Sequence, residues 1–343
     1  MSFQVTLQPS GHVFSAAADQ TLLDAALDAG VNVPYGCRNG ACGACKGKVT
    51  SGQVDHGHYQ ENALPADQRA AGVALFCCAK AQSDLSIECK EVAGAGQIAA
   101  KILPCRVQKL ERLAPDIIAL HLQLPANERL QFLAGQFIEF ILKDGKRRAY
   151  SIANAPHADA LLEVHIRRVP GGLFTEQVFN TMKEKDILRF EGPHGSFTLR
   201  EDSAKPIILL AGGTGFAPVK SIVEHVIHNK IERPIAIYWG SRDRAGLYMD
   251  ALPRQWAAAH PHIRYVPVLS EPSASDAWEG RTGLVHQAVL DDFPDAPGAM
   301  KDVQVYACGA PVMIDAARRD FAARGLPAEE FFADAFTFAP PGQ

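Results

Sequence analysis

Six of the eight cysteines fall within the first ninety residues, and three of them stand close together. Cys37, Cys42 and Cys45 form a C-x4-C-x2-C motif inside a glycine-rich segment, and the cysteine pair 77–78 follows about thirty residues on. This is the spacing of plant-type [2Fe–2S] sites, in which cysteine thiolates hold two irons. Glycines let the backbone curl around a cluster and bring amide groups near its sulfurs. The motif therefore predicts an iron–sulfur cluster.

A structural zinc site is the alternative for these cysteines. Zinc sites usually pair two short C-x2-C units, and the sequence holds a single one, Cys42 to Cys45. The spacing therefore favours the cluster.

The fourth cluster ligand has two candidates, the adjacent Cys77 and Cys78. On an extended segment adjacent side chains point in opposite directions, so only one thiol could face the cluster. The segment resembles plant-type ferredoxin domains, where L-x-C-x-A precedes an Asp-Leu turn. Leu75-Phe-Cys77-Cys-Ala79 followed by Ser83-Asp84-Leu85 matches that pattern, which implies Cys77 as the ligand. We expect the other cysteines here to be ordinary buried residues: Cys78, Cys89 and Cys105.

Two later motifs resemble the flavin-binding barrel of the ferredoxin–NADP reductase superfamily, a resemblance that runs from Pro104 to Phe338. The first is Arg148-Ala-Tyr150-Ser151. The resemblance implies that Arg148 meets a flavin phosphate, Tyr150 lies along the isoalloxazine, and Ser151 reaches the N5 region. The forked guanidinium suits a phosphate, and a flat aromatic side chain suits the ring.

The second flavin motif is Ile166-Arg-Arg-Val-Pro-Gly171-Gly172-Leu-Phe-Thr175. In the superfamily the glycine amides and a Ser/Thr hydroxyl hold the pyrophosphate at a helix start, a place suited to anions. This implies Ile166, Gly171, Gly172 and Thr175 as cofactor-binding residues. A simple turn is the alternative for the two glycines. The domain order resembles FAD enzymes, so FAD is favoured over FMN.

A glycine-rich loop, Gly212-Gly213-Thr214-Gly215-Phe-Ala-Pro218, directly follows an apolar run. It lacks the Gly-Lys-Ser/Thr of a Walker A loop and the G-x-G-x-x-G of ordinary dehydrogenases. It resembles the G-G-x-G-x-x-P nicotinamide loop of the superfamily, where glycines allow close approach of the coenzyme to the backbone and to a helix N-terminus.

The segment Tyr306-Ala-Cys308-Gly309-Ala-Pro311 resembles the superfamily's C-G-x-P turn. The resemblance implies that Cys308 lies beside the nicotinamide C4, where it positions the ring; a buried core cysteine is the alternative. Near the C-terminus, Phe336 either shields the flavin ring or packs as part of an apolar tail. The segment Ser241-Arg-Asp-Arg244 could offer arginines to a 2′-phosphate, but the domain order resembles NADH enzymes, so NADH is favoured over NADPH.

The pattern of elements predicts three domains. The resemblance and the alternating residues near the N-terminus indicate a β-grasp [2Fe–2S] ferredoxin domain at 1–92, in which Asp19 caps a helix that ends at Gly30. A linker follows at 93–103. Short strand-like runs punctuated by Gly and Pro at 104–202 predict an antiparallel FAD-binding β-barrel. Apolar runs alternating with helical patterns at 203–343 predict a doubly wound parallel-sheet NAD(P)-binding domain, so the fold class combines α+β and α/β.

Composition excludes several function classes. With 343 residues and a net charge of −4, the chain has no basic footprint for nucleic acid. It has no apolar run of about 18 residues that would span a membrane. Residues 1–5 lack the basic and apolar pattern of a signal peptide, so we expect a cytoplasmic protein whose cysteines are reduced.

The motifs together predict an oxidoreductase that passes electrons from NADH through FAD and the [2Fe–2S] cluster to a protein acceptor. The domain order resembles reductase components of bacterial oxygenases and of CDP-6-deoxyhexose dehydration, and the wording of the motifs favours the latter. The alternatives are a non-catalytic electron carrier or redox sensor with the same cofactors, and a zinc-stabilised nucleotide-binding module.

Overall fold

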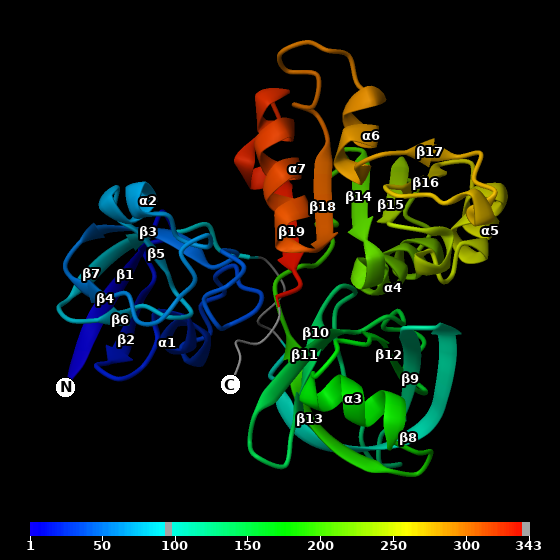
Figure 1. Cartoon of the computed structure of the whole chain (residues 1–343). Coiled ribbons are helices and arrows are strands. Elements are labelled where there is room, and N and C mark those ends of the chain that lie inside the picture. Colours follow the sequence, from blue (N-terminus) through cyan, green and yellow to red (C-terminus); the bar gives the residue numbers. More distant parts are fainter. Residues whose placement is uncertain (93–97, 338–343) are drawn as a thin grey trace. The chain divides into compact units, whose positions relative to one another are not determined.

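The computed structural model describes residues 1–92 and 98–337 (Figure 1), so part of the expected linker, residues 93–97, lies outside the described residues. The chain forms two compact units. Unit 1 is Met1–Ala99 with His194–Phe197, and unit 2 is Ala100–Pro193 with Thr198–Gln343. No helix of the described residues is long and apolar enough to cross a membrane.

Unit 1 contains seven strands and two short helices: β1 (Ser2–Gln8), β2 (Val13–Ala17), α1 (Leu22–Asp28), β3 (Lys46–Ser51), β4 (Val54–Asp55), α2 (Ala66–Ala70), β5 (Val73–Leu75), β6 (Lys80–Ala81) and β7 (Leu85–Glu88). Five strands form a mixed sheet in the order β2-β1-β7-β3-β5, with β1 and β7 parallel and the other pairs antiparallel. The alternating Val5 and Leu7 of β1 are fully buried, as their period predicts. This is the expected β-grasp arrangement. The helix cap differs: Thr21, and not Asp19, accepts a hydrogen bond from the Asp24 amide at 3.1 Å.

The first half of unit 2 is an antiparallel barrel with one helix: β8 (Lys101–Ala114), β9 (Ile117–Gln123), β10 (Phe137–Ile141), β11 (Arg147–Ser151), β12 (Leu162–Arg167), α3 (Leu173–Asn180) and β13 (Ile187–His194). The strand order is β11-β10-β13-β8-β9-β12. The two outer strands meet through the bridge Ile152↔Val164 and the bond from the Ala153 amide to the Glu163 carbonyl at 2.7 Å, which closes the sheet. The expected barrel is confirmed.

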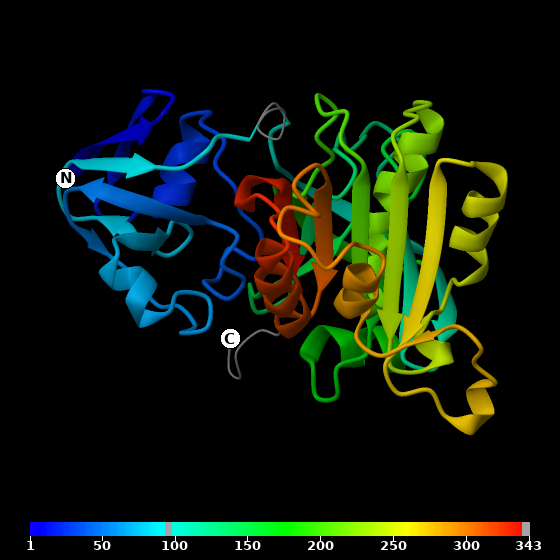
Figure 2. The same cartoon turned by 90° about the horizontal axis from the view of Figure 1, so that it is seen from above.

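The second half of unit 2 is a parallel sheet between helices: β14 (Ile207–Gly212), α4 (Phe216–His228), β15 (Ile235–Ser241), α5 (Ala251–Ala259), β16 (Ile263–Leu269), β17 (Arg281–Thr282), α6 (Val285–Asp291), β18 (Gln304–Gly309), α7 (Pro311–Ala323) and β19 (Phe331–Ala335). The order is β17-β16-β15-β14-β18-β19, and every pairing is parallel. Figure 2 shows α4 and α5 on one face and α6 and α7 on the other. Helices on both faces explain why β14 is a continuous apolar run.

The strand order reverses direction at β14. The chain moves from β14 to β15 on one side and later returns to β18 on the other. In doubly wound sheets a crevice for ligands opens at the carboxyl ends of the two strands that flank such a reversal. The fold therefore places Gly212 and Gly309, the last residues of β14 and β18, at the expected binding edge.

Candidate cofactor and electron-transfer site

The cysteines of the predicted cluster gather in the loop before β3 and the turn after β5. The Cys42 sulfur accepts hydrogen bonds from the backbone amides of Cys37 at 3.4 Å and Ala44 at 3.5 Å. The Cys45 and Cys77 sulfurs lie 3.2 Å apart. The four predicted ligands thus form two pairs, Cys37 with Cys42 and Cys45 with Cys77, which suits two irons with two cysteine ligands each.

The loop backbone is shaped for a cluster. Gly40 and Gly43 have φ of +74° and +72°, where a side chain would strain the chain. Hydrogen bonds from the Cys45 and Cys78 thiols lower the pKa of Cys77 to about 4, and a hydrogen bond from Cys42 lowers that of Cys37 to about 7. Hydrogen bonds and burial instead raise the pKa of Cys42 and Cys45, so each pair holds one lowered and one raised thiol. The pairing of the four sulfurs around the glycine turns is what fits a [2Fe–2S] cluster.

The segment around Cys77 and Cys78 is a turn. The sequence predicted an extended segment, on which the two cysteine side chains would point in opposite directions. The amides of Cys78 and Ala79 both donate to the Leu75 carbonyl, at 2.9 and 2.8 Å. As a result the two sulfurs lie only 3.6 Å apart on the same side. Geometry alone therefore does not exclude Cys78, and the short distance from Cys45 to Cys77 is what favours Cys77.

The predicted nicotinamide loop and the C-G-x-P turn meet at the reversal point of the sheet. A Cβ atom on Gly215 would overlap the carbonyl oxygen of Cys308, and a Cβ on Gly309 would come within 3.1 Å of the Gly212 backbone. Both positions therefore need glycine for the two loops to touch. Pro218 lies in the first turn of α4, where a missing amide hydrogen does no harm.

Three side chains from three strands come together beside this loop contact. Ser151 ends β11, Cys308 lies on β18, and Asp334 is its sheet partner on β19. The Ser151 hydroxyl donates to the Asp334 carboxyl at 3.4 Å. The sequence predicted Ser151 and Cys308 but not Asp334, whose only signal was one acid within an apolar run.

Burial controls the protonation of this group of side chains. Asp334 is only 7% exposed, and burial raises its pKa to about 6 against the opposing hydrogen bond from Ser151. Burial, with the Asp334 charge beside it, raises the pKa of the Cys308 thiol well above its usual value. Cys308 is therefore a neutral thiol suited to packing, and Asp334 can hold or release a proton near neutral pH.

The flavin-motif residues line β11. The ring of Tyr150 packs against Phe140 and Phe174, with centroids 5.8 and 5.5 Å away, and burial raises its pKa. Arg148 lies two residues earlier, so it shares a strand face with Tyr150, while Ser151 lies on the other face. The strand thus directs an aromatic ring and a guanidinium to one side and a hydroxyl toward Asp334.

The predicted pyrophosphate segment precedes α3. Gly171 is exposed with φ of +74°, and Gly172 is the N-cap residue, with no side chain over the helix start. The Thr175 hydroxyl donates to the Val169 and Gly172 carbonyls, at 3.0 and 3.2 Å, and so holds the loop in shape. Ile166 is fully buried in the barrel core and pairs with Ile118 of β9, so the structure places it under the site as a core residue.

Comparison with known proteins finds the same three parts in the same order. Family models match at residues 5–82 (2Fe-2S iron-sulfur cluster binding domain), 104–199 (oxidoreductase FAD-binding domain) and 209–319 (oxidoreductase NAD-binding domain). The CDP-6-deoxy-L-threo-D-glycero-4-hexulose-3-dehydrase reductase of Yersinia pestis is 44% identical over 98% of this chain and 99% of its own length. Reductase component 2 of terephthalate 1,2-dioxygenase from Comamonas sp. is 35% identical over 100% and 99%. The crystal structure of an Amycolatopsis cytochrome P450 reductase has a TM-score of 0.78 at 35% identity, with 98% of this chain and 99% of that chain covered.

This chain belongs to the ferredoxin–NADP reductase superfamily. It is a flavin and iron–sulfur oxidoreductase of the branch with a [2Fe–2S] ferredoxin domain. The expected fold class, the [2Fe–2S], FAD and nicotinamide cofactors, and the electron-transfer activity are confirmed.

The predicted nicotinamide loop of this reductase is held by side chains that the motif did not reveal. The Trp239 indole donates to the Gly213 carbonyl at 2.9 Å. A Cβ on Gly213 would lie 3.1 Å from the Arg167 guanidinium, so β12 of the barrel brings a positive charge to the loop. Phe336 donates its amide to the Gly309 carbonyl at 2.8 Å, which sets its half-buried ring at the end of β18.

A polar network around the buried Lys220 and His165 joins the barrel to α4, the helix that begins at this loop. The Lys220 ammonium lies 3.1 Å from Glu163 and 3.1 Å from Glu224. Glu163 also bonds to His165 at 2.7 Å, and the other His165 nitrogen bonds to the Tyr248 hydroxyl at 2.8 Å. Although burial opposes it, the contacts with His165 and Lys220 lower the pKa of Glu163 to about 2. We call these five residues the barrel–α4 network.

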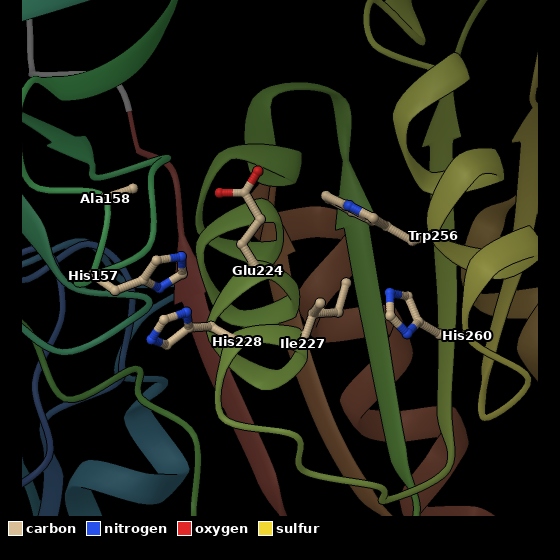
Figure 3. A pocket seen from close by; sticks show the side chains of 7 residues that line it. All are labelled: His157, Ala158, Glu224, Ile227, His228, Trp256 and His260. Carbon is tan, nitrogen blue, oxygen red and sulfur yellow. The ribbon is translucent and has the colours of Figure 1, made fainter.

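The pocket at the far end of α4 is a different place. It measures about 450 Å³ and contains none of the predicted cofactor residues; its lining is His157, Ala158, Glu224, Ile227, His228, Trp256 and His260. Figure 3 shows the His157 and His228 rings face to face, 3.7 Å apart. Burial and the neighbouring His228 lower the pKa of His157, so the His157 ring is neutral near neutral pH. We assign the chemistry to the sheet edge and not to this pocket.

Proposed function

We propose that this reductase oxidises NADH and delivers single electrons to an iron–sulfur dehydrase that acts on a CDP-hexulose. A bound flavin would supply hydride acceptance and one-electron release, and a [2Fe–2S] cluster held by unit 1 would supply one-electron transfer. The residue roles rest on one observation: Ser151, Cys308 and Asp334 converge at the reversal point of the sheet, where the glycine loop touches the Cys308 carbonyl.

In this proposal the chain mainly positions its cofactors. The loop Gly212–Gly215 and Gly309 admit the nicotinamide, and Cys308 packs against it without forming a covalent bond. Ser151 and Asp334 would hold a proton at the serine oxygen, through the hydrogen bond that joins the two side chains. Holding two reacting groups in line accounts for a large part of such catalysis.

The remaining candidates bind the cofactors. Arg148 and the turn at Gly171 and Gly172 would hold the flavin phosphates, Tyr150 would pack along the ring, and Phe336 would cover it. Support comes from the shared face of Arg148 and Tyr150 on β11 and from the uncapped start of α3. The proposed cluster ligands are Cys37, Cys42, Cys45 and Cys77. The proposed domains are 1–92, 104–202 and 203–343, with the linker 93–103 between the first two.

The preference for NADH is supported by the segment after β15. Arg244 donates to the Asp276 carbonyl at 3.1 Å, and the Asp243 carboxylate caps the Gly246 amide at 3.0 Å. The guanidinium of Arg244 is therefore engaged, and a carboxylate at this position repels a 2′-phosphate. We expect kcat/KM for NADH to exceed that for NADPH by at least about tenfold, since about 1.4 kcal/mol suffices. Equal values for the two coenzymes would contradict this assignment.

The choice of a CDP-hexulose dehydrase as the electron acceptor is supported by sequence identity, which is greater to the Yersinia reductase than to the dioxygenase reductase. An oxygenase component is the second candidate, because the 35% identical relative spans the full chain. The third, a carrier or sensor without turnover, conflicts with a nicotinamide loop built for close approach.

All eight cysteines lack disulfide bonds, which supports work in the reducing cytoplasm.

Two measurements test the proposal. The absorption spectrum should show flavin and iron–sulfur bands that anaerobic NADH bleaches; bands that NADH and NADPH leave unchanged would refute turnover. The protein is then mixed with a CDP-hexulose 3-dehydrase or with a terephthalate-type oxygenase. NADH-dependent turnover of the dehydrase, and not of the oxygenase, is expected, and the reverse pattern would move the assignment to oxygenases.

A further inference from the structure

Cys78 is the cysteine that the proposed cluster leaves unused, although it stands beside the cluster loop. Its sulfur is 3.6 Å from that of Cys77 and half-buried. Two thiolates on one tetrahedral metal with bonds near 2.3 Å stand roughly 3.8 Å apart. The Cys78 sulfur is therefore about as far from Cys77 as one ligand of a metal is from the next.

The turn after β5 is the cause of this closeness. Because the Cys78 and Ala79 amides both fold back to the Leu75 carbonyl, Cys77 and Cys78 do not alternate as strand residues do. The cluster loop also leaves room for the second thiol. A Cβ on Gly40 would come within 2.7 Å of the Cys78 sulfur, so only glycine at position 40 lets this thiol lie against the loop.

Cys89, also in unit 1, shows what an ordinary cysteine looks like here. Its sulfur faces the backbone carbonyls of Lys46 and Lys90, at 4.0 and 3.8 Å. It is thus a suitable control for the loss of a buried thiol, whereas Cys78 faces other thiols.

We propose that Cys78 is a reserve cluster ligand, which takes the fourth position when Cys77 cannot hold it. This inference rests on the proposed [2Fe–2S] site. In the exchange, the bond from iron to the Cys77 sulfur breaks and one from the same iron to the Cys78 sulfur forms. The Cys78 proton passes to the departing Cys77 thiolate, and no oxidation state changes. The sulfur moves by no more than 3.6 Å, and thiolate is replaced by thiolate.

The exchange should change the properties of the cluster. Cys78 is more exposed than Cys77, and the reduction potential of a cluster depends on solvent exposure and on hydrogen bonds to its sulfurs. A cluster held through Cys78 should therefore show a shifted potential and altered electron paramagnetic resonance.

The test compares the full-length protein with Cys77→Ala, Cys78→Ala, the double variant, and Cys89→Ala as the control. Iron, acid-labile sulfide, flavin content and the resonance spectrum of the reduced protein are measured. We expect Cys77→Ala to keep at least about half of the iron with a changed spectrum, since cysteine ligands are then still four in number. Cys78→Ala and Cys89→Ala should match the unchanged protein, and the double variant should lose its cluster but keep its flavin.

Three results would overturn the inference. Cys77→Ala could be as empty as the double variant, including after anaerobic reconstitution with ferrous iron and sulfide. Cys78→Ala could lose the cluster while Cys77→Ala keeps a normal one, which would make Cys78 the primary ligand. The double variant could keep its cluster. Absence of a cluster from the unchanged protein would instead refute the proposed function, so the two failures are distinguishable.

Discussion

A buried carboxyl group at the edge of the NAD-binding sheet is costly to keep. Asp334 has one hydrogen-bond donor that the structure places near it, Ser151, and burial raises its pKa to about 6 from 3.8. A side chain kept at a cost to stability, beside the predicted hydride-transfer residues, is best explained by function. Its role in proton transfer and its effect on stability can be measured separately.

The variant Asp334→Asn should be more stable than the unchanged protein above neutral pH, and less active. Ionisation of a carboxyl group with a raised pKa destabilises the folded state. That cost is absent below pH 3.8, grows as the pH rises toward about 6, and is complete above it. The gain should approach about 3 kcal/mol at pH 8, because each tenfold change in proton affinity is worth about 1.4 kcal/mol. Thermal release of the flavin, followed by fluorescence at pH 4 and pH 8, measures it.

The exposed Asp302 provides the control, since Asp302→Asn should show no pH-dependent difference. Flavin reduction by NADH should slow in Asp334→Asn. If Asp334 carries the proton, the rate in the unchanged protein changes with pH near 6, and this change should be missing from the variant. A variant that is destabilised equally at both pH values would show that the carboxyl group is a structural anchor and not a proton carrier.

Single residues differ in how far the sequence predicts them. Ser151 and Cys308 belong to motifs with fixed neighbours, so their types and positions could be predicted. Asp334 could not, because its role depends on the pairing of β19 with β18, which no local pattern announces. The prediction that Cys77 and Cys78 point in opposite directions was wrong for a similar reason. In the sequence, a turn of three residues cannot be told from the end of a strand.

At the scale of elements, α4 connects the nicotinamide loop to the flavin barrel. The barrel–α4 network places Lys220 between Glu163 and Glu224 with its side chain 8% exposed. Ser221 adds a bond to the Asn154 carbonyl at 2.8 Å. Because α4 starts at the glycine loop, these contacts fix the loop relative to β11 and β12.

Replacing Lys220 by Met should destabilise unit 2 by about 1–3 kcal/mol, because two partly buried carboxylates lose their cation. Flavin release should occur at a lower temperature, while loss of the cluster bands of unit 1 should not shift. The additional change Glu163→Gln should restore part of the loss. Lys183→Met, at an exposed lysine of the same unit, is the control. An equal effect of both lysine variants would show that the network contributes no more than a surface charge.

The sequence predicts which of these segments are helices and which are strands, but it does not predict the side-chain contacts between them. The apolar run of β14 predicts a strand buried on both faces, and regular short strands predict the barrel. Lys220 and Glu163 instead look like ordinary solvated charges, since they are 57 residues apart and lie on a helix and a strand of different halves of unit 2. Their pairing follows from tertiary packing alone.

At the scale of the whole molecule, the chemistry is divided between two units with separate cores. The core of unit 1 includes Leu7, Leu22 and Phe76, and the barrel core of unit 2 includes Leu120, Phe140 and Phe190. Two cores predict that damage to one unit leaves the other folded. The division also separates the reaction: hydride transfer belongs to unit 2, and one-electron delivery belongs to unit 1.

The variant Cys42→Ala should therefore lose electron delivery to a protein acceptor but keep oxidation of NADH at the flavin. Loss of this ligand removes the cluster, so NADH-dependent reduction of a one-electron protein acceptor such as cytochrome c should fall by at least about a hundredfold, while reduction of ferricyanide at the flavin stays within about twofold. Cys89→Ala, which removes a buried thiol of the same unit that faces no other thiol, should change neither rate. A parallel fall of both rates in Cys42→Ala, with flavin content unchanged, would mean that unit 1 takes part in hydride transfer. The two units would then have to be treated as one catalytic body.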